Sequence, residues 1–486
     1  MKRTLISETI NCVGQEVTVS GWANVVRAHG KILFVDLRDR TGLLQVVFLP
    51  QEADTYEKVK SIRPEWVISI TGNIVSRPEK MVNDKIVTGK VELVAKTLEV
   101  LAEAKTSPFD IGTAGYEVDE EKRLQYRYLD LRRERMQRNL RKRHIFIQAM
   151  RDFLTREEFC EIETPYLTKS TPEGARDFVV PSRLQPGNFY ALPQSPQQYK
   201  QLLQVGGIEK YFQVARCFRD EDPRADRQAE FTQLDLEMSF VEQEDIMEVN
   251  ERMVIETVQK LFPEKKIQQI PFPRLDYKDV MQKYGTDRPD IREDKNDPNL
   301  LAFCWVINFP FFEKADNGGW TFTHNPFSAP KPEFVSDLMA KKNVGDIITT
   351  QYDIVLNGAE IGGGSIRNHK PEALEAVFEI MGYEKERIYN NFGHILEAFR
   401  YGTPPHGGIA YGFDRFISIL LGEPNIREVM AFPKTGDSRD PMMSAPSKID
   451  AKQLKELKIE VQGDKKKVLG VKKKVSASGS KPRKKK

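Results

Sequence analysis

The chain has 486 residues, 40% hydrophobic and 30% charged, which is the composition of a globular protein of more than one domain. Its four cysteines are scattered and form no CxxC pair, which argues against a zinc site or a disulfide framework and favours a reducing, cytoplasmic location. The sequence holds no run of the ~18 apolar residues that a membrane span needs, and it begins without the apolar stretch of a signal peptide. We therefore expect a cytoplasmic protein that binds neither a membrane nor zinc.

The net charge of +3 is unevenly distributed. Residues 464–486 contain eleven Lys and Arg and a single Asp, a net of +10, which leaves −7 on the rest of the chain. A tail of this composition, with Gly, Ser and Pro, cannot bury a core and is expected to be disordered. It is predicted either to add non-specific affinity for a polyanion or to serve only as a solubilising tail.

The first hundred residues have β character. Alternating or β-branched runs predict five strands, with a helical pattern at 51–62; the strands are expected at 16–30, 31–39, 42–48, 66–76 and 90–101. A helix between the third and fourth strands is the order of an OB-fold barrel, whose second and third strands face single-stranded nucleic acid. On that face Phe34 would stack on a base, Gln45 would bind a base edge and Arg27 a phosphate. A position in the core is the alternative for Phe34.

The middle of the chain has a different organisation. Residues 106–135 have the composition of a polar connector, and the pattern after it predicts a helix over 133–156. A larger α/β region then extends to about residue 440. No internal repeat is found.

The stretch FRDEDPRADRQAEFTQLD, residues 218–235, mixes arginines and carboxylates, which is also typical of a solvated hairpin. Its second half alternates, so Leu234 and its neighbours at every second position would face a core, while Phe231, Gln233, Asp235 and Glu237 share the other face. The preceding strand, YFQVARCFR, ends in an arginine that would lie beside this polar face. We predict a nucleotide site in which Phe231 stacks on a base and Asp235 binds an ammonium group.

The segment QYDIVLNGAEIGGGSIR, residues 351–367, predicts a β-hairpin with an Asn-Gly turn. In that register Val355 lies opposite Glu360, and Asp353 lies opposite Gly362. Asp353 and Glu360 then share a face at roughly 7 Å, a spacing at which two carboxylates suit a bridging Mg²⁺ held together with substrate phosphates. A solvated polar hairpin is the alternative.

Two further features of these segments suit anions. The glycines at 362–364 let a ligand approach the backbone, and Arg367 would clamp a carboxylate with two hydrogen bonds. In GGIAYGFDRFISILLG, residues 407–422, Arg415 opens a helix and is expected to reach a phosphate there. No GxxxxGK[ST] pattern occurs, so a P-loop is excluded.

Together these segments resemble a known family. FCEIETP, which ends at Pro165, the stretch 218–235, and GFDR at 412–415 resemble motifs 1, 2 and 3 of the class II aminoacyl-tRNA synthetases. A preceding OB barrel marks the subgroup for aspartate, asparagine and lysine. Within this subgroup the bacterial-type aspartyl-tRNA synthetases are resembled by TPEGARDF (171–178), ALPQSPQQYKQLL (191–203), GGGSIR and AFPK (431–434).

The resemblance implies an α+β architecture. A five-stranded OB-fold anticodon-binding domain at 1–105 and a hinge at 106–135 would precede a class II catalytic domain at 136–445, an antiparallel sheet flanked by helices. A C-terminal extension with the Lys-rich tail would fill 446–486. The family also implies a homodimer formed through the segment that ends at Pro165.

Site residues are implied position by position. Arg219 and Arg415 would be catalytic. The aspartate contacts would be Glu173, on a flexible loop, with Ser195, Gln197, Lys200, Arg219, Gln233, Asp235, His324 and Arg367. The ATP contacts would be Arg219, Asp220, Glu221, Gln228, Phe231, Glu360, Gly412, Phe413, Asp414 and Arg415, with Mg²⁺ on Asp353 and Glu360. The anticodon contacts would be Arg27, His29, Phe34, Gln45, Arg77 and Glu92, while Arg224 and Asp226 at a loop tip would face tRNA or solvent.

The implied activity is ATP-dependent ligation of L-aspartate to tRNA(Asp). Whether tRNA(Asn) is also charged stays open, because His29 resembles relatives that charge both tRNAs and Lys80 resembles those that do not. There are two alternative hypotheses. One is a sister synthetase for asparagine or lysine, and the other is a non-catalytic nucleic-acid-binding relative.

The chain also departs from the family pattern. Bacterial relatives usually carry an insertion of about a hundred residues between the segments 284–290 and 301–310, where this chain has a short joint. Asn325 stands where a second histidine is common, Phe413 replaces a leucine, and Val25 replaces an arginine of the anticodon loop.

Overall fold

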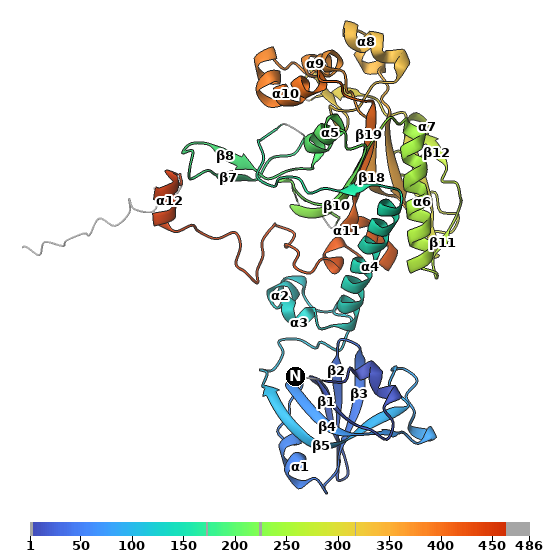
Figure 1. The fold of residues 1–486 in the computed structure, drawn as a ribbon, viewed down its shortest axis with the longest axis vertical. Helices are drawn as coiled ribbons and strands as arrows, with labels where there is room; N and C mark the ends of the chain where they lie inside the picture. Colours follow the sequence, from blue (N-terminus) through green and yellow to red (C-terminus); the bar gives the residue numbers. More distant parts are fainter. Residues whose placement is uncertain (1–2, 172–173, 223–225, 316, 463–486) are drawn as a thin grey trace, which may run out of the picture. The chain divides into compact units, whose positions relative to one another are not determined.

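The computed structural model describes residues 3–171, 174–222, 226–315 and 317–462 (Figure 1). The fold divides into two compact units, with the boundary between Gln137 and Arg138. Three of the predicted features, namely Glu173, Arg224 and the tail 464–486, lie outside the described residues.

The first unit is built on a closed barrel in which five strands follow one another in the order β1-β2-β3-β5-β4. The strands are β1 (Glu16–His29), β2 (Ile32–Asp39), β3 (Gly42–Phe48), β4 (Val67–Ser76) and β5 (Val91–Ala102). Helix α1 (Ala53–Val59) lies between β3 and β4, so the predicted five-stranded OB-type barrel is confirmed. Alternate residues such as Val35 and Leu37 fill the barrel, and every second side chain therefore remains outside. The same unit contains two short 3-10 helices, η1 (Ile6–Asn11) and η2 (Glu79–Met81).

The segment predicted as a polar connector is folded. It forms helices α2 (Glu120–Gln125) and α3 (Arg127–Asp130), and the Asp130 side chain is fully buried. Arg127 and Arg133 each donate to Asp130 at 2.7 Å. Burying charged groups is tolerated here because the carboxylate and the guanidinium groups satisfy one another.

The second unit contains an eight-stranded sheet in the order β12-β14-β17-β18-β19-β10-β9-β6. The inner pairs are antiparallel, as predicted, whereas the edge pairs β12/β14 and β6/β9 are parallel. A parallel pair needs a crossover connection, and α7 and α5 lie in these two connections. The strands are β6 (Cys160–Glu161), β9 (Lys210–Phe218), β10 (Glu230–Ser239), β12 (Arg274–Asp276), β14 (Phe303–Ile307), β17 (Gln351–Leu356), β18 (Ala359–Ile366) and β19 (His406–Gly412).

One face of this sheet is apolar and the other is polar. Leu234, Leu236 and Met238 of β10 pack in the main core with side chains of α4 (Glu134–Arg156), α6 (Gln243–Leu261) and α11 (Phe413–Leu421). In Figure 1, α6 lies along this side of the strands. The alternate residues of β10 face away from the core, and α5 (Gln197–Val205) contributes side chains to that polar face. The amphipathic alternation of β10 therefore positions the site.

Smaller elements surround the sheet. α9 (Pro371–Ile380) and α10 (Lys385–Phe399) share a second apolar cluster. The remaining elements are α7 (Tyr277–Tyr284), α8 (Val335–Ala340), η3 (Pro332–Phe334), η4 (Val344–Asp346), η5 (Ile426–Val429), α12 (Ala451–Leu457), β7 (Val179–Pro181), β8 (Phe189–Ala191), β11 (Lys266–Ile267), β13 (Leu300–Leu301), β15 (Phe312–Lys314) and β16 (Trp320–Phe322). Across the described part of the chain, no helix combines the length and the apolar character required to cross a membrane.

Candidate active site

The register of β9 and β10 brings the charged stretch and its aromatic residue together. Phe231 pairs with Cys217, and Asp235 pairs with Gln213. The Arg219 guanidinium carbon lies 5.2 Å from the centroid of the Phe231 ring, close enough for a cation–π contact. The polar face of β10 therefore combines an aromatic surface with a fixed positive charge, as its alternation predicts.

A pocket opens over these residues between the β9–β10 connection, β18 and the start of α11. Nine of the residues predicted to contact substrates line it: Arg219, Glu221, Gln228, Phe231, Gln233, Glu360, Gly412, Asp414 and Arg415. Gly362, predicted to let a ligand approach the backbone, also lines it, and sequence reasoning had not assigned the other five residues: Asp226, Arg227, Ile361, Ala410 and Ile426. The stretch 218–235, the hairpin 351–367 and the segment 407–422, which are far apart in the chain, thus share one pocket.

Two oxygen atoms accept hydrogen bonds from Arg415 at the N-terminal end of α11. Its Nη1 donates to the Glu360 carbonyl at 2.6 Å, and its Nη2 donates to Asp226 Oδ2 at 3.0 Å. Asp226 is nevertheless exposed, as predicted for a loop-tip residue that faces tRNA or solvent. A guanidinium group at a helix N-terminus is disfavoured by the helix dipole, and the Asp226 carboxylate offsets this cost.

Two polar atoms of the pocket are buried without a hydrogen-bond partner among the described residues, namely Arg415 Nε and Gln228 Nε2. Gln228 is otherwise anchored, because its Oε1 accepts from the Lys434 backbone N–H at 2.8 Å. Unpaired buried donors are costly in a protein interior. An anionic or acceptor-rich ligand would satisfy both.

Three residues of the predicted ATP set have other surroundings. Phe413 does not line the pocket, because its side chain is buried in the main core against Phe146, with ring centroids 5.4 Å apart. Asp220 is exposed beside Arg176 and does not line the pocket. Asp414 lines the pocket but also accepts from the Thr232 backbone N–H at 2.8 Å, which ties α11 to β10.

The β17–β18 hairpin has the predicted Asn-Gly turn. Asn357 and Gly358 both have positive φ, at 50° and 83°, as a two-residue hairpin turn of this sequence requires. Val355 pairs with Glu360 as predicted, but Asp353 pairs with Gly363 and not with Gly362. The reason is a β-bulge, in which β18 carries one more residue than the opposing strand.

Asp353 and Glu360 nevertheless converge. A Cβ atom built on Gly363 would lie 2.6 Å from Asp353 Oδ1 and 3.7 Å from Glu360 Oε1. Burial, followed by the charge of Glu360, raises the pKa of Asp353 well above its ordinary value. Within the described residues neither carboxylate forms an ion pair with Lys or Arg, although Gln351 donates to Asp353 at 3.3 Å. This donor set fits a divalent cation.

The same two carboxylates do not make a complete metal site. No group of three or more His, Cys, Asp or Glu side chains suited to a metal is found among the residues that the structure describes. A hard cation takes six or more oxygen ligands, so a cation here would need oxygen atoms from a ligand or water. Phosphate oxygens are suitable ligands of this kind.

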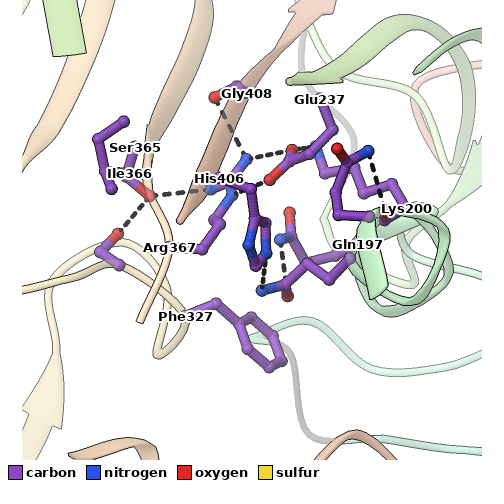
Figure 2. A network of polar contacts seen from close by, with 12 residues as sticks. Gln197, Lys200, Glu237, Phe327, Ser365, Ile366, Arg367, His406 and Gly408 are labelled. Carbon is purple, nitrogen blue, oxygen red and sulfur yellow. Dashed lines mark hydrogen bonds and ion pairs between the residues drawn. The ribbon is translucent and has the colours of Figure 1, made fainter. Parts of the chain in front are cut away.

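Behind the pocket lies a fully buried charge cluster (Figure 2). Lys200 Nζ is 2.6 Å from Asp235 Oδ1 and 3.2 Å from Glu237 Oε2. Arg367 donates to both Glu237 oxygens, at 2.8 and 3.0 Å, and to Ser365 Oγ at 2.8 Å. Two cations and two carboxylates therefore balance one another away from water.

Glu237 is the residue that sequence reasoning missed, and it corrects the role of Arg367. The alternation of β10 placed Glu237 on the polar face, but no partner was assigned to it. Because Glu237 occupies the two-pronged face of the guanidinium, Arg367 cannot offer that face to a substrate carboxylate. The signal that could have identified Glu237 was a carboxylate on a strand too buried to leave it unpaired.

The two carboxylates of the cluster differ in their pKa. For Glu237, burial alone would raise the pKa, but the charges of Arg367 and Lys200 outweigh it and lower the pKa to about 2. For Asp235, burial raises the pKa to about 6, although Lys200 opposes the shift. Asp235 Oδ2 is buried without a hydrogen-bond partner in the described residues. It is the acceptor that a cationic group could use.

The remaining predicted aspartate contacts have varied positions. Gln197 hydrogen-bonds Gln201 at 3.1 Å. Ser195 lines a separate hollow beside α5. His324 packs against Phe309 with ring centroids 4.7 Å apart, and burial lowers its pKa. Asn325, the unusual neighbour of His324, accepts from the Phe327 backbone N–H at 3.0 Å and so stabilises a turn.

In the barrel, five of the six predicted anticodon contacts form one chain of interactions. Arg27 lies 5.7 Å from the Phe34 ring and donates to Gln45 at 2.8 Å. Gln45 donates to Glu92 at 2.8 Å, and Arg77 lies 3.5 Å from Glu92. The sixth residue, His29, ends β1 and is exposed. Sequence reasoning missed Asp36, which also pairs with Arg27.

Comparison with protein families gives two matches. Residues 119–436 match the family described as tRNA synthetases class II (D, K and N). Residues 17–101 match the family described as OB-fold nucleic acid binding domain. The two matches cover the sheet with its pocket and the barrel, respectively.

Curated relatives match almost end to end. The aspartate–tRNA(Asp/Asn) ligase of Caldanaerobacter subterraneus subsp. tengcongensis is 40% identical, with 92% of this chain and 96% of the relative covered. That of Syntrophomonas wolfei is also 40% identical, with 95% of this chain and 100% of the relative covered. The first alignment extends over 574 residues, more than the 486 of this chain, so the relative has residues that this chain lacks.

Solved structures share the fold at lower identity. Asparaginyl-tRNA synthetase from Pyrococcus horikoshii, complexed with asparaginyl-adenylate, has a TM-score of 0.72 and 22% identity and covers 90% of this chain and 98% of its own. A putative aspartyl-tRNA synthetase from Leishmania major Friedlin has a TM-score of 0.69 and 21% identity and covers 89% and 93%.

Proposed function

The chain belongs to the class II tRNA synthetases of the D, K and N group, and on that premise we propose that it is an aspartate–tRNA ligase. It would activate L-aspartate with ATP and transfer the aspartyl group to tRNA(Asp). The observation that carries this proposal is the buried cluster of Lys200, Arg367 and Asp235 behind the pocket. Aspartate has one ammonium group and a side-chain carboxylate, and the cluster offers the unpaired Asp235 Oδ2 atom to the first and unused N–H donors of Lys200 and Arg367 to the second.

Unused donors support the choice of a carboxylate. A guanidinium group has five N–H donors, and the contacts of Arg367 with Glu237, Ser365 and the Gly408 carbonyl use four of them. The Lys200 ammonium has three donors, and its two carboxylate contacts leave one. One donor from each cation therefore remains for a substrate carboxylate within the described residues.

Lys200 and Arg367 carry hydrogen-bond donors and no acceptors, which also supports selection against asparagine. The asparagine side chain would turn an NH₂ group toward Lys200 or Arg367, and a buried donor facing a donor is left unpaired. A site built to bind a polar group rejects an analogue that lacks it by a factor on the order of 10⁴. Lysine would bring a cation against two cations and is excluded more strongly.

In the first step the aspartate α-carboxylate attacks the ATP α-phosphorus, an aspartyl-adenylate forms and pyrophosphate leaves. The substrate carboxylate is itself the nucleophile, so the protein supplies orientation and charge rather than a covalent group. Arg219 would stabilise the charge that develops on the α-phosphate while Phe231 holds the adenine ring. Arg415, at the far side of the pocket, would hold the terminal phosphate.

Mg²⁺ bound together with ATP is compatible with the proposed reaction. Asp353 and Glu360 would hold it, and it would supply positive charge beside the phosphate oxygens.

In the second step the 3′-terminal ribose hydroxyl of tRNA attacks the aspartyl carbonyl carbon, and AMP leaves. The barrel residues Arg27, Phe34 and Gln45 would select the tRNA through its anticodon.

We also propose a cytoplasmic homodimer. Support for the location comes from the cysteines, all four of which are free. Support for the dimer comes from the family resemblance at the segment ending in Pro165, which sedimentation equilibrium of the purified protein would test. A monomer at micromolar concentration would contradict that part of the proposal.

Pyrophosphate exchange tests the activity. Purified protein with ATP and Mg²⁺ should exchange pyrophosphate in the presence of aspartate, and not with asparagine or lysine. Exchange with asparagine alone would identify a sister synthetase, and exchange with none would favour a non-catalytic relative. Aminoacylation of purified tRNA(Asp) and tRNA(Asn), side by side, would then decide between one tRNA and two.

A further inference from the structure

A line of buried hydrogen bonds connects a backbone carbonyl to the candidate aspartate site, and Figure 2 shows the part of it between His406 and Gln197. It passes from Pro404 through His406 and Gln201 to Gln197. His406 and Gln201 are both fully buried. In such surroundings every donor must meet an acceptor, because a mismatch cannot be relieved by water.

The first member of the line fixes the tautomer of His406. The Pro404 carbonyl can only accept, and it lies 2.8 Å from His406 Nδ1. Nδ1 must therefore carry a hydrogen. Burial lowers the pKa of His406 to about 4, so at neutral pH the ring is uncharged and Nε2 carries no hydrogen.

The tautomer then fixes two amides. His406 Nε2 can only accept, and its partner at 3.3 Å is Gln201 Nε2. The Gln201 Oε1 atom is thereby turned to Gln197, whose Nε2 donates to it at 3.1 Å. Gln197 has its NH₂ group committed to this bond, and its Oε1 atom is left to face a ligand.

The position of Gln197 indicates which group of the substrate its amide oxygen would bind. Gln197 lies one turn from Lys200 on α5, and residues at this spacing share a helix face. Lys200 contacts Asp235, whose free Oδ2 atom suits an ammonium group. The only strong donor of L-aspartate is its α-ammonium group, so an amide oxygen at this place would bind it, whereas an amide NH₂ would oppose it.

We propose that His406 and Gln201 are positioning residues, which hold Gln197 with its carbonyl oxygen toward the α-ammonium group of aspartate. This inference rests on the proposed function, since it concerns the same amino acid. It adds two buried side chains that touch no substrate but set which end of Gln197 does.

Succinate provides the discriminating probe, because it has the two carboxylates of aspartate and no ammonium group. Calorimetric titration of the full-length protein with each compound gives the preference for aspartate over succinate. In Gln201→Leu the Gln197 amide is free to turn, and aspartate affinity should fall about tenfold, the contribution of one hydrogen bond to a charged group, with succinate affinity unchanged.

Gln204→Leu is the matched control. Gln204 is also a buried glutamine of α5, and it bonds Ser239 at 2.6 Å instead of joining the line to Gln197. Its loss should lower the melting temperature while the preference for aspartate over succinate stays that of wild type. A fall of the preference in both variants would show a general loosening of α5 and would overturn the inference.

Variants of His406 test the other member. His406→Phe removes the acceptor for Gln201 and should reduce the preference about tenfold, the loss expected for Gln201→Leu. His406→Gln can place its Oε1 near the former Nε2 position and should restore the preference. If Gln201→Leu does not fold, the two His406 variants make the same comparison.

The outcomes separate this inference from the proposed function. Wild-type protein that binds aspartate, with a preference that survives both Gln201→Leu and His406→Phe, would leave the function standing and refute the positioning role. Wild-type protein that does not bind aspartate would refute both.

Discussion

Arg367 and Glu237 face each other with two hydrogen bonds, at 2.8 and 3.0 Å, and both side chains are almost completely buried. The pair lies 130 residues apart in the chain and joins β10 to the end of β18. It neutralises one of the two cations of the candidate aspartate site and also blocks the face of Arg367 that a substrate would otherwise use. Its removal should therefore affect both stability and selection.

Glu237→Gln should lower the free energy of unfolding by about 3 kcal/mol, because loss of one partner leaves Arg367 and Lys200 with an uncompensated buried charge. Urea denaturation would measure the change. Glu256→Gln, which breaks an exposed pair with Arg156, should cost less than about 1 kcal/mol. Equal losses in the two variants would contradict the importance of the buried cluster.

Aspartate affinity should weaken as the pH falls through about 6, because burial raises the pKa of Asp235 to about 6 and protonation removes the acceptor for the ammonium group. The sign follows from a raised carboxyl pKa, since the folded protein takes up this proton at a higher pH than the unfolded chain does. Titration calorimetry from pH 5 to 8 would measure the dissociation constant. In Asp235→Asn the binding should be weaker and should lose this pH dependence, and a dependence that persists would assign it to another group.

Arg219→Ala should reduce the rate of aspartate-dependent pyrophosphate exchange by at least about 100-fold, because it removes a donor aimed at charge that develops on the α-phosphate. Arg216→Ala, three residues earlier in β9, is the control, since Arg216 pairs with Glu230 and does not line the pocket. Exchange by Arg219→Ala within tenfold of wild type would exclude the proposed role.

Gly363→Ala should raise the Mg²⁺ concentration needed for half-maximal exchange by about tenfold, because the new methyl carbon would lie 2.6 Å from Asp353 Oδ1 and displace that carboxylate. A titration of activity against Mg²⁺ measures this. Gly393→Ala, whose new atom would meet Tyr389 at an ordinary 3.6 Å, should leave the Mg²⁺ dependence unchanged. An unaltered Mg²⁺ requirement in Gly363→Ala would argue against Asp353 as a ligand.

Phe34→Ala should reduce the efficiency of tRNA charging about tenfold or more, because a stacked base loses on the order of 1–3 kcal/mol without its aromatic platform. Pyrophosphate exchange needs no tRNA, so the same variant should exchange at the wild-type rate. If both activities fall together, Phe34 supports the barrel and does not bind the anticodon.

Predictions from the sequence held where the cause is local. The turn at Asn357 and Gly358 formed because these residues accept positive φ, and the two faces of β10 separated because side chains of a strand alternate. The same alternation placed Arg219 near Phe231. No more than a few neighbouring residues decide each of these features.

Other features required the whole fold. Asp353 pairs with Gly363 instead of Gly362 because of a β-bulge, and the hairpin sequence does not predict this bulge. Asp226 turned toward Arg415, and Phe413 entered the core, because of partners more than a hundred residues away. Such contacts are set by packing between elements, which periodicity does not report.

The amino-acid sequence by itself determined the barrel, the hairpin and the order of the motifs, because strand alternation and turn preferences act over short stretches of chain. Only the tertiary structure decided which charges neutralise one another. A buried carboxylate pairs with the cations that packing brings within hydrogen-bonding distance, and for Glu237 these are Arg367, two strands away in the sheet, and Lys200 of α5.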